Sequence, residues 1–260
     1  MEVVISSSYE GMSEAAAQVV ADVLNTKPDA VLGLATGSTP LGLYKQLVRM
    51  HRDEGLDFSQ VTSFNLDEYV GLPGDHPQSY HYFMNENLFN HINIPKQNIH
   101  IPSGTTHNYQ AFCAWYERRI EECGGIGLQI LGIGSDGHIA FNEPTSSLSS
   151  RTRLKTLAKP TIDDNARFFD NRDDVPIYAI TMGVGTILDA EQIVLVANGK
   201  NKARAVADAV EGPVTSMCTA SALQLHPSTW FYVDDEAASE LQMREYYDWV
   251  QNKKPGAPST

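Results

Sequence analysis

The chain has 260 residues, of which 42% are hydrophobic and 20% charged, as in an ordinary globular protein of one large or two small domains. Its formal net charge of −13 argues against a nucleic-acid partner, and no apolar run of about 18 residues could span a membrane. The three cysteines, Cys113, Cys123 and Cys218, form an odd set without metal-ligand spacing. We therefore expect free thiols in a reducing, cytoplasmic environment, and no secretory signal.

Strands and helices are expected to alternate along the chain, because short apolar runs are separated by amphipathic or alanine-rich stretches. The predicted strands are 2–6, 30–35, 61–66, 126–133, 177–182, 192–197 and 229–233, and the predicted helices are about 11–26, 41–52, 78–91, 109–123, 200–211 and 235–250. This alternation favours an α/β fold in which helices cover both faces of a doubly wound, mostly parallel sheet. We expect a single domain over residues 1–250 and a flexible C-terminal tail over 251–260.

The segment 36–40 lies between a predicted buried strand and a predicted helix. It consists of Thr36, Gly37, Ser38, Thr39 and Pro40. Hydroxyls and backbone amides at the N-terminus of a helix form a ready site for phosphate, although the segment matches neither common nucleotide-binding motif. A simple helix cap by Ser38 or Thr39 is an equally good interpretation. Lys202 and Arg167 are cations that could complete a phosphate site, but each alone is more often a solvated surface charge.

The predicted strand 61–66 ends in two acidic residues, Asp67 and Glu68. Asp67 is a candidate base if its surroundings raise its pKa toward neutrality. The alternative is that the pair caps a helix or turn. Three separate junctions between a predicted strand and the loop that follows it carry acid/base or phosphate-binding residue types. This is expected where loops meet at the carboxyl edge of one sheet.

The stretch 130–143, ILGIGSDGHIAFNE, combines a predicted buried strand with a tight turn. Its glycines relax the backbone where the chain must turn sharply or approach a ligand. The turn presents Asp136, His138 and Glu143, and an imidazole between two carboxylates can be held in one tautomer and poised near neutral pH. A polar surface turn and a metal site are the alternatives. We expect no metal, because no other His or Cys has ligand spacing.

Three segments, 32–40, 64–72 and 132–144, resemble signature segments of the glucosamine-6-phosphate deaminase family. The similarity extends in order from about residue 30 to residue 233, and the segments 149–153, 165–169 and 223–227 also resemble the family. The resemblance implies a Rossmann-like α/β fold related to the 6-phosphogluconolactonases. It also implies conversion of glucosamine 6-phosphate and water to fructose 6-phosphate and ammonia, without a cofactor.

The resemblance also implies roles for individual residues. His138 matches the residue that opens the sugar ring, with Asp136 and Glu143 flanking it, and Asp67 matches the base that moves a proton from C2 to C1. Arg167 lies in a segment, about residues 156–176, that acts as a mobile lid in the family. The residues that match the phosphate site are Thr36, Gly37, Ser38, Thr39, Arg167 and Lys202.

Regulation is implied only for some members of the family. In these, N-acetylglucosamine 6-phosphate activates a hexamer by binding between subunits. The matching positions here are Ser146, Arg151, Arg153 and Lys155. An exposed basic strand edge is the alternative interpretation, and the chain after about Glu240 departs from the regulated pattern. We expect a homo-oligomer, with a hexamer and an activator site left open.

Two other functions were weighed. A related lactonase would need the turn at residues 134–138 but not Asp67 as a base toward carbon. The continuation at residues 139–144 resembles the deaminases instead. A sugar-phosphate sensor of the transcription-regulator type would carry a DNA-binding segment, which the acidic composition does not favour.

Overall fold

Seven parallel strands form the central sheet of the computed structural model, which describes residues 1–254. These strands are β1 (Glu2–Ser6), β2 (Val31–Leu34), β3 (Thr62–Asn65), β5 (Ile99–His100), β6 (Leu128–Leu131), β9 (Gln192–Ala197) and β10 (Thr229–Asp234). Their spatial order is β1-β10-β9-β6-β2-β3-β5, and every pair is parallel. From β2 the chain builds outward to β3 and β5, then returns to β6 and builds the other way. The boundary between β2 and β6 is therefore the switch point at which open α/β sheets bind ligands.

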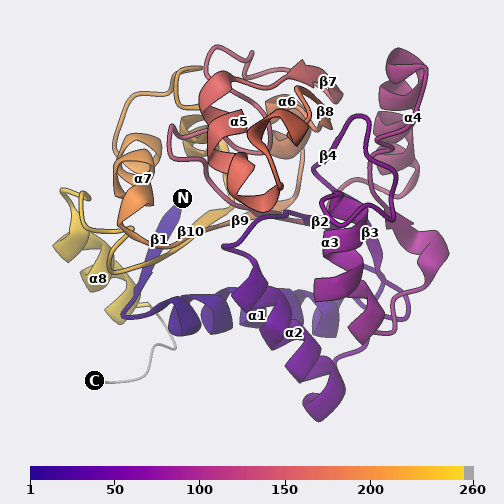
Figure 1. Cartoon of the computed structure of the whole chain (residues 1–260). Coiled ribbons are helices and arrows are strands. Elements are labelled where there is room, and N and C mark those ends of the chain that lie inside the picture. The colour runs from indigo at the N-terminus through magenta and orange to yellow at the C-terminus, as the bar shows by residue number, and fades with distance from the viewer. Residues whose placement is uncertain (255–260) are drawn as a thin grey trace.

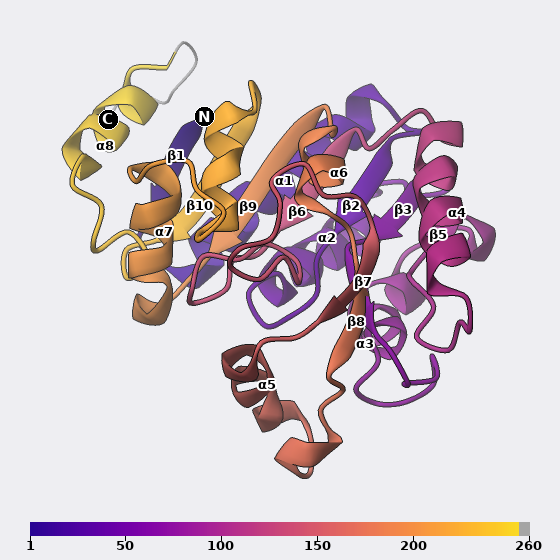
Figure 2. The ribbon, with the colours of Figure 1, turned by 90° about the horizontal axis from the view of Figure 1, so that it is seen from above.

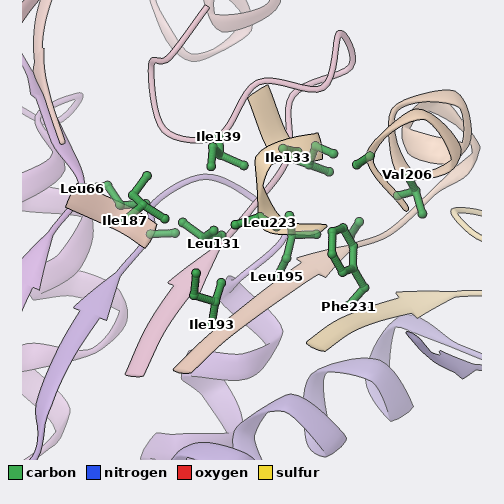
Figure 3. Close-up of a cluster of buried hydrophobic side chains, with 14 of the residues drawn as sticks. Leu66, Leu131, Ile133, Ile139, Ile187, Ile193, Leu195, Val206, Leu223 and Phe231 are labelled. Atoms are coloured by element: carbon green, nitrogen blue, oxygen red, sulfur yellow. The ribbon is translucent and has the colours of Figure 1, made fainter. Parts of the chain in front are cut away.

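Helices cover both faces of this sheet (Figure 1). The helices are α1 (Tyr9–Thr26), α2 (Leu41–Glu54), α3 (Tyr80–Asn87), α4 (Tyr109–Glu122), α6 (Val184–Leu188) and α7 (Ala203–Val210). Residues of α1, α2 and α3 share one buried cluster, whereas residues of α4, α6 and α7 share another. Successive residues of β9 alternate between the clusters, so that Val194 belongs to the first and Ile193 and Leu195 to the second (Figure 3). This arrangement confirms the predicted fold class.

A second, antiparallel sheet was not predicted. Its strands are β4 (Asp67–Tyr69), β8 (Tyr178–Thr181) and β7 (Arg153–Thr156), in the order β4-β8-β7. The expectation that 177–182 is a strand of the main sheet is therefore wrong. Leu66 joins the two sheets, because its N–H donates to Leu34 of the main sheet and its carbonyl accepts from Met182 after β8.

The segment between β7 and β8 contains α5 (Lys159–Asn165) and the short 3₁₀ helices η3 (Ala166–Phe168) and η4 (Arg172–Asp174). Figure 2 shows α5 standing away from the main sheet at the end of the smaller one. This is the segment in which the lid over residues 156–176 was predicted, and its mobility stays a prediction. Further short 3₁₀ helices are η1 (Phe89–His91), η2 (Lys96–Asn98), η5 (Lys200–Lys202) and η6 (Thr219–Leu225).

The predicted helix 235–250 is wrong in its first half. Residues 235–243 form turns, and α8 spans Arg244–Asn252. The carboxylate of Glu211 accepts hydrogen bonds from the N–H groups of Gln242 and Met243, directly before the first residue of α8. Two residues of the predicted tail, 251 and 252, thus belong to α8, while 255–260 lie outside the described residues. Within the described part of the chain, no helix has the length and apolarity needed to cross a bilayer.

Candidate active site

A cavity of about 430 Å³ lies over the carboxyl ends of β2, β3, β6 and β9, beside the switch point. Four loops that are far apart in the sequence meet there, because the parallel strands before them all end at the same edge of the sheet. The lining residues include Thr36, Gly37, Ser38, Thr39, Pro40, Leu66, Asp67, Tyr80, Gly134, Ser135, His138, Phe141, Asp164, Arg167, Asn198 and Lys202. Asp67, His138 and both candidate phosphate-binding cations therefore face one shared space.

Asp67 opens the short strand β4 and faces this cavity. Its side chain is 6% exposed, and no described residue donates a hydrogen bond to its carboxylate. Burial raises the pKa of Asp67 to about 8, and the neighbouring charge of Glu68 adds to the effect. A carboxylate with so high a pKa is a stronger proton acceptor than an ordinary aspartate.

Glu68 has a different role from its neighbour, because successive side chains of a strand point to opposite sides. Its carboxylate accepts the N–H groups of Tyr80 at 2.9 Å and His81 at 3.0 Å, at the first turn of α3. It also lies 2.9 Å from His81 Nδ1. The capping interpretation of the acidic pair therefore holds for Glu68, while Asp67 is left facing the cavity.

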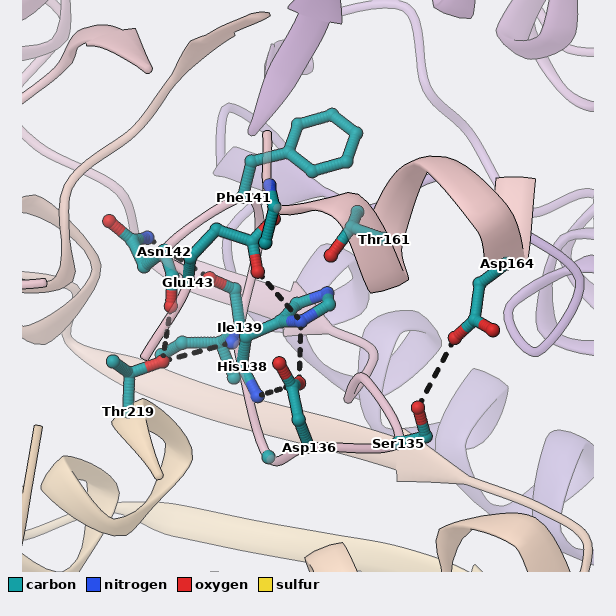
Figure 4. Close-up of polar contacts among 12 residues, drawn as sticks. Ser135, Asp136, His138, Ile139, Phe141, Asn142, Glu143, Thr161, Asp164 and Thr219 are labelled. Carbon is teal, nitrogen blue, oxygen red and sulfur yellow. Dashed lines mark hydrogen bonds and ion pairs between the residues drawn. The ribbon is translucent and has the colours of Figure 1, made fainter. Parts of the chain in front are cut away.

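His138 lies between two carboxylates in the turn after β6 (Figure 4). Its Nδ1 is 2.7 Å from Asp136 Oδ1 and 3.9 Å from Glu143 Oε2. Burial acts to raise the pKa of Asp136, but the contact with His138 outweighs it and lowers that pKa. Glu143 is buried, and its Oε1 accepts the N–H of Ala158 at 2.9 Å. With Nδ1 turned to the carboxylates, Nε2 is the nitrogen left for a substrate.

Two glycines make this turn sterically possible. A Cβ at Gly134 would lie 2.3 Å from Cε1 of the His138 ring, so any side chain there would displace the imidazole. Gly137 has φ +84° and packs against Cys218, whose Sγ would be 2.4 Å from an added Cβ. The turn is thus folded tightly around the histidine.

The same three residues are the group that could hold a metal ion among the described residues. One donor atom from each of Asp136, His138 and Glu143 lies within 4.8 Å of the others. His138 Nδ1 and Asp136 Oδ1 are, however, already in direct contact at 2.7 Å. We interpret the group as one that handles protons, and the expectation of no metal stays a prediction.

The segment 36–39 forms the second wall of the cavity. Gly37 has φ +96°, a left-handed conformation that suits glycine. The N-cap of α2 is Pro40, and no side chain caps that helix. The helix-cap interpretation of Ser38 and Thr39 is therefore wrong. Thr39 Oγ1 instead donates to Asn198 Oδ1 at 2.8 Å, which joins the loop after β2 to the loop after β9.

The cations come from two other elements. Lys202 ends η5 at the start of α7, and Arg167 lies in η3, in the segment between β7 and β8. Within the described residues, neither has a carboxylate oxygen within 4.0 Å of its nitrogens. Burial lowers the pKa of Lys202. The pair thus supplies local positive charge in an acidic protein.

The residues predicted for an activator lie outside this cavity. Arg151 is paired with Glu117 and Asp189 at 2.6 Å and 2.5 Å. Arg153 donates to Asn142 Oδ1 at 2.9 Å. Ser146 is buried, and Lys155 lies on β7. The role of these residues stays a prediction.

Several lining residues were not predicted. Asn198 directly follows β9, so the strand-end rule that selected Asp67 could also have found it. Tyr80 and Phe141 stack with ring centroids 6.1 Å apart, a contact between distant segments that no local pattern signals. Asp164 likewise comes from α5, which was not predicted as a helix.

An open α/β sheet with buried acid/base groups and two cations at its switch point defines a protein that binds small anions and can move protons on them. Comparison with known proteins agrees with this class. The profile of the family described as glucosamine-6-phosphate isomerases/6-phosphogluconolactonase matches residues 6–230, and the chain belongs to this family.

Its similarity to individual proteins covers nearly the whole chain. It is 52% identical to a glucosamine-6-phosphate deaminase of Shewanella woodyi, over 96% of this chain and 95% of that protein. It is 53% identical to one of Thermoanaerobacter pseudethanolicus, over 92% of this chain and 94% of that protein. The solved structure of a monomeric glucosamine-6-phosphate deaminase superposes with a TM-score of 0.91 at 46% identity, covering 92% of this chain and 100% of that one. A 6-phosphogluconolactonase from Trypanosoma brucei, with TM-score 0.70, 18% identity and coverage of 92% and 98%, shows the shared fold alone.

Proposed function

We propose that the protein converts glucosamine 6-phosphate and water to fructose 6-phosphate and ammonia. The relatives with about half of their residues identical are all deaminases of this kind. The observation that carries the proposal is that Asp67 and His138 line the same cavity as Lys202. A sugar bound there by its phosphate would present its reacting carbons to both acid/base groups.

Ring opening is the first step that we assign. The cyclic sugar must lose the proton of its C1 hydroxyl and gain a proton on the ring oxygen. His138 is suited to this transfer, because Nδ1 is held by Asp136 and Nε2 is left for the substrate. Glu143, held by the Ala158 N–H, also flanks the imidazole, with Oε2 3.9 Å from Nδ1.

Isomerisation and loss of ammonia follow. Asp67 takes the proton from C2, which the aldehyde at C1 acidifies, and the electron pair moves to form an enolamine. Return of the proton to C1, together with transfer of one proton from the nitrogen to the C1 oxygen, gives an imine at C2. Water then adds to C2 and the nitrogen leaves as ammonia, so that the keto sugar remains. The buried position and raised pKa of Asp67 support its role as the base.

Binding of the phosphate is assigned to the wall formed by the segment 36–39, together with Arg167 and Lys202. The hydroxyls of Ser38 and Thr39 and the adjacent backbone would donate to its oxygens. We propose that residues 156–176 act as a lid, because Arg167 can meet the phosphate only if this segment lies against the cavity.

The lactonase alternative has weaker support. A hydrolase acting on a lactone attacks a carbonyl carbon with water and needs no base that removes a proton from carbon. The burial of Asp67 inside the cavity is the feature that such a reaction would leave unused.

The test is direct. Purified protein should release ammonia from glucosamine 6-phosphate without added metal or nucleotide. Release that persists after chelation with EDTA would support the expectation of no metal. Folded protein that hydrolyses 6-phosphogluconolactone but releases no ammonia would reverse the assignment.

We further propose that the protein is cytoplasmic, that it assembles into a homo-oligomer and that N-acetylglucosamine 6-phosphate activates it. The ion pairs of Arg151 with Glu117 and Asp189 would have to open for that side chain to bind an activator. A related deaminase is a monomer. Measuring the molecular mass and the activity in parallel, with and without N-acetylglucosamine 6-phosphate, decides both the assembly and the activation.

A further inference from the structure

A carboxylate shares the cavity with the two cations proposed to bind phosphate. Asp164, on α5, lines the cavity together with Arg167 and Lys202. Its Oδ2 accepts a hydrogen bond from Ser135 Oγ at 3.2 Å, as Figure 4 shows. The hydrogen bond joins this exposed carboxylate to the turn that carries His138, at the mouth of the cavity.

The charge of Asp164 acts on Lys202. After burial, which lowers the pKa of Lys202, the Asp164 charge has the largest effect on that pKa and raises it. A phosphate monoester carries a charge of about −1.5 to −2 near pH 7. A carboxylate that lines the same cavity therefore opposes entry of the phosphate, while the cations favour it.

We propose that Asp164 is an internal counter-anion of the phosphate site. It offsets the charge of Lys202 and Arg167 in the ligand-free protein, and it raises the Kd of every phosphate ligand that enters. Asp164 thereby sets the working affinity of the cavity. This inference rests on the proposed function, since it takes these two cations as the phosphate ligands.

The chain offers a matched control on the same helix. Asp163, the preceding residue, is also an exposed carboxylate, but it pairs with Arg172 and does not line the cavity. Asp163→Asn therefore removes the same charge from nearly the same place. Asp164→Glu restores the charge at the position under test.

The experiment measures the Kd of inorganic phosphate for the full-length protein by isothermal titration calorimetry. Asp164→Asn should bind phosphate about three- to tenfold more tightly than the wild type at low salt. This difference in Kd should become smaller as NaCl is added. Asp163→Asn should stay within about twofold of the wild type, and Asp164→Glu should return close to it. The KM for glucosamine 6-phosphate should fall in Asp164→Asn in the same direction.

Two results overturn the proposal in distinguishable ways. If Lys202→Ala weakens phosphate binding but Asp164→Asn leaves it unchanged or weaker, the phosphate site stands and the counter-anion role fails. If Lys202→Ala leaves phosphate binding unchanged, the assignment of the site fails and the role of Asp164 fails with it. If Asp163→Asn and Asp164→Asn tighten phosphate binding equally, the change reflects only the net charge of the protein, and the specific role of Asp164 fails.

Discussion

The turn after β6 and the segment between β7 and β8 border the same cavity but are built differently. In the turn, buried groups fix the backbone: Ile139 N–H donates to Thr219 Oγ1 at 3.2 Å, and Thr219 Oγ1 donates to the carbonyl of Asn142 at 2.9 Å. In the segment, the ion pairs are between exposed side chains, such as Arg172 with Asp163. Proton transfer depends on placement within fractions of an ångström, whereas holding a charge does not. The firmly held turn therefore suits the proposed proton transfer, and the more exposed segment suits the proposed binding of a charged group.

Replacing the base should have the largest effect. Asp67→Asn keeps the size of the side chain but removes the proton acceptor, so kcat should fall about 10²–10⁴-fold. Exchange of the C2 hydrogen with solvent should be lost to a similar degree. Both are measured with glucosamine 6-phosphate, by ammonia release and by NMR. The Kd of inorganic phosphate should change little, and loss of phosphate binding instead would reassign Asp67 to a structural role.

Replacing the partly buried Lys202 should act on binding. Lys202→Ala removes a desolvated charge from the proposed phosphate wall, so KM should rise about 10- to 100-fold, as expected for a charged hydrogen bond. Lys200→Ala is the matched control, because Lys200 is exposed and does not line the cavity. Its KM should stay near that of the wild type. A pure kcat effect in Lys202→Ala would contradict the phosphate assignment.

The raised pKa of Asp67 predicts a pH-dependent cost to stability. Below about pH 4, Asp67 is protonated in both the folded and the unfolded chain, so its ionisation contributes no difference. Between there and about pH 8, the unfolded chain loses this proton while the buried carboxyl keeps it, and the folded state is progressively destabilised. The Tm of Asp67→Asn relative to wild type should therefore rise from pH 5 to pH 8 by at least about 2–4 °C, or roughly 1 kcal/mol.

A constant Tm difference over that range would mean that the carboxyl ionises as easily in the folded protein as in the unfolded chain. Burial would then not explain why Asp67 is a stronger base than an ordinary aspartate.

The smallest effect is expected in the segment between β7 and β8. Arg172→Ala removes an exposed ion pair with Asp163, and such pairs contribute about 0–1 kcal/mol. The Tm should shift by no more than about 4 °C. A large loss of stability would show that this segment is as firmly built as the turn after β6.

The sequence best predicted the site residues that lie in the loop directly after a buried strand. The buried strands β2, β6 and β9 are mostly apolar, and because they are parallel, the loops that follow them meet at the same edge of the sheet. Contacts between distant short segments were not predictable. β4 has three residues and pairs with β8 across more than a hundred positions, so neither its pairing nor the separation of Asp67 from Glu68 has a local signature.

The interrupted helix after β10 has a similar cause. Residues 235–250 have a composition that suits a helix, but the carboxylate of Glu211 accepts backbone N–H groups at Gln242 and Met243. A tertiary hydrogen bond of this kind outweighs helix propensity, which amounts to less than about 1 kcal/mol per residue.

The edge strand β1 has a consequence for biosynthesis. In the described sheet it pairs only with β10, so the first strand to leave the ribosome waits for the last one. β9, which precedes Lys202, must also insert between β6 and β10 before the phosphate wall exists. A nascent chain that already contains Asp67 and His138 therefore still lacks part of the wall of the proposed site until translation has nearly finished.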